Sequence, residues 1–286
     1  MLLPSGLWAI HDAKTHLPKI DAILGKAKLE QGFSAGPAND AERDGLPLAV
    51  IGQTAIVSSV GPLLKEGGFL RFLGLASIRD TQKAILAAGN DPDIERNIWV
   101  VDSPGGSVDG IHDLAGVVNA VASSKPIIVQ VDGMLASAAY MMVAGATEIY
   151  AGPTNLIGSV GVITHLEDSS AKFENEGVKV IPVMTGLHKT TGEPGVPISD
   201  EQIDQVQSLV NGTMAIFREQ MRVSRGLSAE VMNEIADGSL YLAADALRLG
   251  LIDGIRNLGT ALESINQAPQ GRSTRLARVA IANLQI

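Results

Sequence analysis

Two short segments of the sequence carry residue types that can act on an acyl bond. The first is Asp-Ser-Pro-Gly-Gly-Ser at residues 102–107, which follows an apolar run and precedes a helical pattern. Glycines in such a turn expose backbone N–H groups, which can hold a phosphate or the oxyanion of a tetrahedral intermediate. A Pro-Gly-Gly turn is also common as a purely structural feature, so this segment alone decides nothing.

The second segment is Ala-Ser-Ala-Ala-Tyr at residues 136–140, again between an apolar run and a helical pattern. A hydroxyl group on Ser137 would face the free N–H groups and the positive dipole end of the helix, which suits a nucleophile. The simpler interpretation is that a small residue among alanines lets two helices pack closely, with its hydroxyl merely hydrogen-bonded. Both interpretations stay open at this point.

The candidate general base is Lys189, in a loop that also contains glycines. A lysine acts as a base only when neutral, so its pKa must fall from about 10.4 to roughly 7–8 through burial or cationic neighbours. His112, His165 and His188 keep a Ser-His-Asp triad open, and His188 is the strongest rival because it neighbours Lys189. No metal-ligand spacing of the His-Glu-x-x-His kind occurs, and no cofactor is expected.

Composition narrows the class of protein. The 286 residues carry a formal net charge of −9, which argues against nucleic acid as a partner, because such binders place Lys and Arg against phosphates. The absence of cysteine excludes a thiolate nucleophile and a disulfide framework. The N-terminus reads poorly as a signal peptide, and the uncharged stretch at 133–147 is too short to span a bilayer and is expected to be a buried helix. A cytoplasmic protein without a membrane anchor is expected.

The elements that must position these residues alternate between strand and helix, which predicts an α/β fold with a mostly parallel sheet. Ser199 is expected to cap a long helix, Ser228 the next one, and Gly250 to close a third in the left-handed conformation. Strands are predicted at 48–51, 55–60, 97–101, 127–131, 148–150, 161–164 and 178–184. Helices are predicted at 78–88, 108–122, 136–145, near 171, at 200–225, after 228 and at 243–250, with an irregular loop at 185–197.

Three regions follow from the distribution of these patterns. Residues 1–45 are predicted to form a leading helix, at 13–29, and a Gly- and Pro-rich linker. Residues 46–260 are predicted to form one catalytic domain, and residues 261–286 a flexible C-terminal tail.

Taken in order, four motifs are distinctive: Ser-Pro-Gly-Gly-Ser-Val at 103–108, Ala-Ser-Ala-Ala-Tyr at 136–140, Gly-Ser-Val-Gly-Val at 158–162 and Leu-Gly-Leu-Ile-Asp at 249–253. The set resembles signal peptide peptidase A and its phage relatives, the capsid-maturation serine proteases. The resemblance covers about residues 48–258 and implies the Clp/crotonase fold, a ββα superhelical spiral. It also implies a serine endopeptidase that acts on proteins or peptides.

The same resemblance implies roles for single residues. Ser137 matches the nucleophile, Lys189 the base, and Ser159 a polar residue that hydrogen-bonds the lysine, while the N–H groups of Gly106 and Ala138 match the oxyanion hole. Further residues expected to contact substrate are Gly105, Ser107 and Val108. In this family the dyad can assemble across a subunit boundary, so a ring-shaped homo-oligomer is implied as well.

Several functions remain to be separated. The Ala-Ala pair after Ser137 resembles the phage branch, which implies cleavage of scaffold and capsid proteins during head maturation. One alternative is a cellular signal-peptide or quality-control peptidase of the same family. The others are a crotonase-like acyl-CoA hydratase or isomerase, whose mark would be a catalytic carboxylate at the site, and an inactive assembly module. The C-terminal tail could also lie in the active site of a neighbouring subunit.

Overall fold

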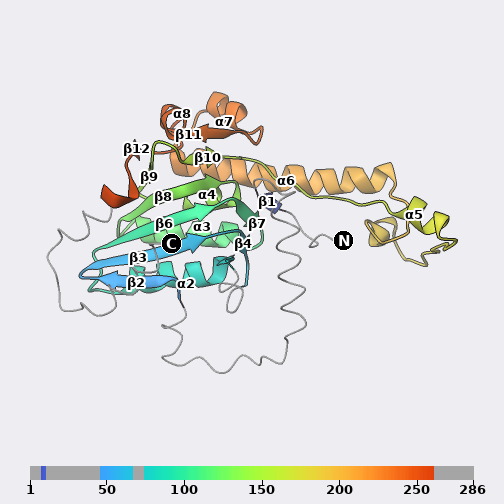
Figure 1. Cartoon of the computed structure of the whole chain (residues 1–286), viewed down its shortest axis with the longest axis horizontal. Helices are drawn as coiled ribbons and strands as arrows, with labels where there is room; N and C mark the ends of the chain where they lie inside the picture. Colours follow the sequence, from blue (N-terminus) through green and yellow to red (C-terminus); the bar gives the residue numbers. More distant parts are fainter. Residues whose placement is uncertain (1–7, 11–45, 67–73, 261–286) are drawn as a thin grey trace, which may run out of the picture.

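A computed structural model of the chain describes residues 8–10, 46–66 and 74–260 (Figure 1). The helix predicted at 13–29, most of the linker and the C-terminal tail lie outside the described residues. Within the described part, no helix has the length and apolar character needed to cross a membrane.

An eight-stranded sheet forms the centre of the molecule (Figure 1). Its strands run in the order β11-β10-β8-β6-β3-β2, with β9 beside β8 and β12 beside β9. Only the β2–β3 and β10–β11 pairs are antiparallel among these described strands, so the predicted α/β class with a mainly parallel sheet is confirmed. The bounds are β2 Leu48–Ile51, β3 Thr54–Val60, β6 Arg96–Ser103, β8 Ile127–Ala136, β9 Glu148–Ala151, β10 Leu156–Gly158, β11 Leu240–Leu242 and β12 Gly254–Ile255.

A smaller four-stranded sheet, in the order β1-β7-β4-β5, stands beside the end of β6 (Figure 1). Strands β7 and β5 run parallel to β4, whereas β1 runs antiparallel to β7. The bounds are β1 Trp8–Ile10, β4 Leu63–Leu64, β5 Ala76–Ser77 and β7 Gly105–Ser107.

Three helices, α2 (Ile78–Asn90), α3 (Ile111–Ala122) and α4 (Ala138–Val143), form a row that packs against the main sheet. Their apolar residues make one core with the strands, and every residue of α4 is buried. The helix predicted at 136–145 is shorter than expected, because β8 extends to Ala136 and α4 covers only residues 138–143. The uncharged stretch at 133–147 is therefore part strand and part helix, rather than one buried helix.

Helix α6 (Asp200–Arg225) is the longest helix described and runs from the outermost part of the molecule back to the sheet (Figure 1). Ser199 accepts a hydrogen bond from the Gln202 N–H, and the Gln202 side chain accepts one from the Ser199 N–H. This reciprocal cap confirms the predicted start of the helix. Helices α7 (Ala229–Ile235), capped by Ser228, and α8 (Ala243–Arg248) complete the C-terminal part.

Residues 165–199, here named the arm, precede α6 and contain α5 (Ser170–Asn175) and one turn of 3-10 helix, η3 (Leu187–Thr190). The strand predicted at 178–184 is wrong, since this segment has no regular secondary structure, and Val183 is 98% exposed. The strand predicted at 161–164 is also wrong, because β10 ends at Gly158 and only Ile163 within 161–164 forms an isolated bridge. The loop at 185–197, predicted to be irregular throughout, holds the η3 turn.

Candidate active site

Ser137 occupies the junction between β8 and α4 in a backbone conformation that only glycine adopts easily. Its φ is 57° and its ψ is −123°, which for a side-chain-bearing residue costs about 1–3 kcal/mol. The Ser137 N–H donates to the Gly158 carbonyl at 2.8 Å, and its carbonyl accepts from the N–H groups of Tyr140 and Met141 at 2.9 and 3.1 Å. The neighbouring strand and the first turn of α4 therefore hold this strained conformation in place.

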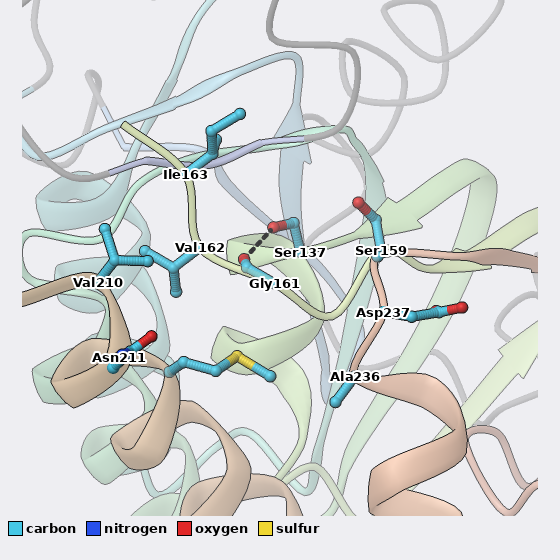
Figure 2. Close-up of a pocket in the computed structure, with 11 residues that line it drawn as sticks. Ser137, Ser159, Gly161, Val162, Ile163, Val210, Asn211, Ala236 and Asp237 are labelled. Atoms are coloured by element: carbon cyan, nitrogen blue, oxygen red, sulfur yellow. Dashed lines mark hydrogen bonds between the residues drawn. The ribbon is translucent and has the colours of Figure 1, made fainter. Parts of the chain in front are cut away.

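The Ser137 hydroxyl opens on a pocket of about 420 Å³ between β10, α6 and the segment after α7 (Figure 2). The hydroxyl donates to the Gly161 carbonyl at 3.2 Å, and the serine itself is only 1% exposed. The pocket walls are mostly apolar. The lining residues are Ser137, Ser159, Gly161, Val162, Ile163, Val210, Asn211, Met214, Ala236, Asp237 and Gly238.

Ser159 lines the same pocket and has the other positive φ among the described residues that are not glycine, at 49°. Its N–H donates to the Ser239 carbonyl at 2.7 Å. The preceding Gly158 has a φ of 126°, and a Cβ there would lie 2.6 Å from the same carbonyl. The contact between the end of β10 and the start of β11 thus fixes Ser159, and the structure brings together two of the residues singled out in the sequence.

The two candidate oxyanion donors lie on neighbouring elements. Ala138 is the first residue of α4, where a backbone N–H has no acceptor within the helix. Gly106 lies in β7, which packs against α4. A Cβ on Gly106 would lie 2.1 Å from the Leu63 carbonyl, so only glycine lets β7 approach β4 this closely.

The residues beside Gly106 do not line the pocket. Gly105 and Ser107 pair with β1, and the Ser107 hydroxyl accepts a hydrogen bond from the Asp109 N–H at 3.2 Å. Val108 packs against the main core. Gly105 and Ser107 belong to β7, which packs against α4, the helix that begins directly after Ser137. Among the residues expected to contact substrate, those of β7 therefore approach this helix through their backbone.

Lys189 lies on η3 and is exposed, away from the pocket. The Gln202 side chain donates to the Leu187 carbonyl at 2.7 Å, which attaches η3 to the first turn of α6. The α6 residues that line the pocket begin eight positions after Gln202 and end at Met214, roughly 12–18 Å farther along the helix axis. One chain alone does not bring Lys189 to Ser137, and the lysine amine has no hydrogen bond or ion pair with any residue that the structure describes.

The histidines give no alternative pairing within the described part of the chain. His112 is on the exposed face of α3, and His165 and His188 are exposed in the arm. The Ser137 hydroxyl donates a hydrogen bond to a backbone carbonyl and has none with an imidazole of the described residues. The described residues therefore do not assemble a Ser-His-Asp triad.

Some site residues carry no signal in the sequence. Asn211 and Met214 reach the pocket because α6 crosses it, and Asp237 because the chain turns back after α7. Asp102, the first residue of the 102–107 segment, accepts a hydrogen bond from the Met134 N–H at 2.9 Å. Burial raises the pKa of the Asp102 carboxyl above its ordinary value, and nearby Asp132 adds to this effect. Through the hydrogen bond from Met134, Asp102 connects β6 to β8.

A serine strained at a strand-to-helix turn is the arrangement that α/β-hydrolases use to expose a nucleophile. The chain matches the model of peptidase family S49 over residues 119–271, which is more than half of its length. The chain therefore belongs to peptidase family S49, and the peptidase class predicted from the sequence is confirmed.

Three relatives illustrate the range of the family. A putative protease of Methanocaldococcus jannaschii is 33% identical over 177 residues, covering 62% of this chain and 57% of the relative. The capsid assembly protease C of Escherichia phage lambda is 26% identical over 262 residues, covering 90% and 60%. The chloroplastic serine protease SPPA of Arabidopsis thaliana is 26% identical over 217 residues, covering 75% and 32%. This chain thus spans between a third and three fifths of these relatives' lengths, and the predicted resemblance to signal peptide peptidase A and its phage branch is confirmed.

Proposed function

We propose that the chain is a serine endopeptidase of the Clp/crotonase fold, with Ser137 as nucleophile and Lys189 as general base. The observation that carries this proposal is the strained backbone of Ser137, which is maintained at the mouth of a pocket although it costs stability. A strained residue that the surrounding structure holds in place is a common mark of a functional site. Membership of a peptidase family supports the same reaction class.

The chemistry follows from the positions of the donors. The Ser137 oxygen attacks the peptide carbonyl carbon while its proton passes to neutral Lys189. The N–H groups of Gly106 and Ala138 stabilise the negative charge that develops on the carbonyl oxygen. Collapse of the tetrahedral intermediate breaks the C–N bond, the protonated lysine gives its proton to the leaving amine, and water then hydrolyses the acyl-enzyme. Ser159 would orient the lysine amine from its place in the same pocket.

The lysine must come from a neighbouring copy of the chain, since η3 lies too far from the pocket along α6 for a lysine side chain to reach. The arm and α6 expose apolar side chains that a second copy would cover. These residues are Val178, Ile181, Val183, Met184, Leu187, Ile203, Leu209, Ile216 and Val223. A head-to-tail contact of this kind closes into a ring when its rotation divides a full turn, which is compatible with the homo-oligomer implied by the resemblance.

The proposed biological role is cleavage of scaffold or capsid proteins during phage head assembly. The lambda relative, named a capsid assembly protease, aligns with 90% of this chain, whereas the chloroplastic SPPA protease aligns with 75%. The broader match supports the phage role over a cellular peptidase. Particles assembled with Ser137→Ala are then expected to retain uncleaved scaffold protein, which gel electrophoresis reveals.

A crotonase-like hydratase would need a catalytic carboxylate, and Asp237 is a carboxylate in the pocket lining. Its oxygens accept hydrogen bonds from the Ser239 N–H at 2.9 Å and the Ser239 hydroxyl at 2.8 Å. These bonds hold the pKa of Asp237 below its ordinary value, which makes it a weaker base. The carboxylate is therefore better suited to fixing the turn after α7 than to moving protons.

The decisive experiment is the intact mass of the protein after reaction with a fluorophosphonate probe. We expect one adduct on the wild type and none on Ser137→Ala, because the probe bonds only to an activated serine. Lys189→Ala should slow labelling by about 10²–10⁴-fold, the usual contribution of a general base. His188→Ala, one residue away on the same turn, is the matched control and should label at the wild-type rate.

Three results would contradict the proposal. An adduct that persists in Ser137→Ala would place the nucleophile elsewhere, and no adduct on the assembled wild type would favour an inactive assembly module. Loss of labelling in His188→Ala with normal labelling of Lys189→Ala would move the base to the histidine.

A further inference from the structure

Strand β1 lies against the strand that carries the proposed oxyanion donor (Figure 1). Its residues Trp8, Ala9 and Ile10 pair antiparallel with Ser107, Gly106 and Gly105, respectively. The strand also contacts α4, the helix that begins directly after Ser137. A segment far from the active-site motifs in sequence thus lies directly beside them.

The other edge of β7 is not open to a peptide. Strand β4 pairs there, with Leu63 opposite Gly106. The contact is so close that even a methyl group on Gly106 would overlap the Leu63 carbonyl. The edge of β7 that β1 covers is therefore the one at which an extended backbone can be added or exchanged.

A substrate must place its scissile carbonyl about 3 Å from the serine oxygen and from both oxyanion donors. One donor belongs to Gly106 in β7 and the other to Ala138 at the start of α4. A peptide held between these two elements runs along β7, and adding a strand to a free edge is a common way to bind extended peptides. Strand β1 takes up this place in the structure.

We propose that the outer edge of β7 is the binding groove for an extended polypeptide backbone, and that residues 8–10 of the chain occupy this groove as an internal strand that substrate must displace. The proposal rests on the proposed peptidase function and adds a means of regulation to it. Strand β1 has only three residues, and each hydrogen bond of such a ladder contributes little net stability. Substrate can therefore displace β1 easily. The presence of β1 in the groove lowers the apparent affinity for substrate but does not prevent turnover.

The test is Ala9→Pro in the full-length chain, because proline has no N–H and fits poorly in a paired strand. Ala9→Val is the matched control, since valine keeps the N–H and favours strands. We expect Ala9→Pro to lower KM for a synthetic peptide substrate by about fivefold, the effect of losing roughly one hydrogen bond of the pairing. The kcat should stay within about twofold because the catalytic groups are unchanged, and Ala9→Val should behave as the wild type.

Two further measurements do not depend on cleavage. Amide hydrogen exchange at residues 105–107 should be faster in Ala9→Pro than in Ala9→Val, because the outer edge of β7 is uncovered. A synthetic peptide of residues 5–14 should compete with substrate, and more strongly in Ala9→Pro than in the wild type, in which the groove is already filled. If Ala9→Pro folds poorly, competition between the synthetic peptide and substrate in the wild-type protein still tests the proposal.

The outcomes separate this inference from the function on which it rests. If fluorophosphonate labels Ser137 equally in all three proteins but KM, amide exchange and peptide competition do not change, β1 is only a structural strand and the inference is wrong. If the probe labels none of them, the peptidase function fails, and the exchange at residues 105–107 still shows whether β1 covers the β7 edge. Slower turnover in Ala9→Pro without a change in KM would also overturn the inference.

Discussion

At the scale of single residues, the two serines of the pocket share an unusual property, since both have positive φ without being glycine. The sequence could single out Ser137 and Ser159 from their motifs, but not this strain, because residue type alone favours ordinary backbone conformations here. The strain is held by hydrogen bonds to neighbouring segments: Ser137 bonds with Gly158 and with the first turn of α4, and Ser159 bonds with Ser239. The sequence also could not place Asn211 or Asp237 at the site, because their contact with it depends on how α6 and α7 pack.

The strain gives a stability prediction. Ser137→Ala and Ser137→Gly both remove the hydroxyl, but only glycine adopts a φ of 57° without a steric cost. We expect Ser137→Gly to be about 1 kcal/mol more stable to urea than Ser137→Ala, after allowing for the greater freedom of glycine in the unfolded chain.

The urea midpoints of the two variants measure this difference when both variants unfold with the same m-value. Equal midpoints would mean that the junction relaxes when the hydroxyl is lost. The serine side chain itself would then hold the conformation, through its contact to Gly161.

At the scale of elements, the capping signals were sufficient to place the start of α6, whereas apolar alternation at 178–184 was not sufficient to make a strand. A cap is satisfied by residues within three or four positions, as in the bonds between Ser199 and Gln202. A strand instead needs a hydrogen-bonded neighbour, and periodicity carries no information about that neighbour. The alternating pattern at 178–184 reflects the positions of apolar side chains, and these side chains are exposed in the single chain.

Gln202 connects the two elements that would deliver the base. Besides its part in the cap, its side chain donates to the Leu187 carbonyl and to the Thr190 hydroxyl, and it is 2% exposed. Gln202→Leu keeps most of the side-chain volume but removes these bonds, so η3 should lose its fixed position. We expect peptide hydrolysis to fall by about tenfold, a moderate effect for a group that positions a catalytic residue.

Gln205→Leu is the control, because Gln205 is exposed on the same helix. Initial rates of peptide hydrolysis and of fluorophosphonate labelling should fall together in Gln202→Leu and stay at wild-type values in Gln205→Leu. Unchanged rates in Gln202→Leu would show that η3 does not need this attachment.

At the scale of the whole molecule, the proposed nucleophile and the proposed base lie far apart in the described chain. The fold could be anticipated as α/β from the alternation of strands and helices, but the separation between Ser137 and Lys189 could not. It depends on α6 extending the arm away from the sheet (Figure 1). A site completed by a second copy makes activity a property of the assembly.

Mixing two inactive variants tests this arrangement. Co-expression of Ser137→Ala with Lys189→Ala should restore activity, because a subunit with an intact serine can meet a neighbour with an intact lysine. Random assembly gives about one quarter of wild-type activity, since each partner is intact in half of the cases. Size-exclusion chromatography followed by a hydrolysis assay measures the recovered activity. Mixed oligomers with no activity would place both residues of the dyad in one chain.

The burial of Trp99 also gives an optical consequence. The chain has two tryptophans, and the Trp99 indole is fully buried and donates to the Ser59 hydroxyl at 3.0 Å. Ser59 also has a hydrogen bond with Thr81, so Trp99→Phe does not leave that hydroxyl without a partner. The variant then has Trp8, on β1, as its single tryptophan. Its emission, followed by stopped-flow mixing with peptide, would record the departure of β1 in real time and without any added label.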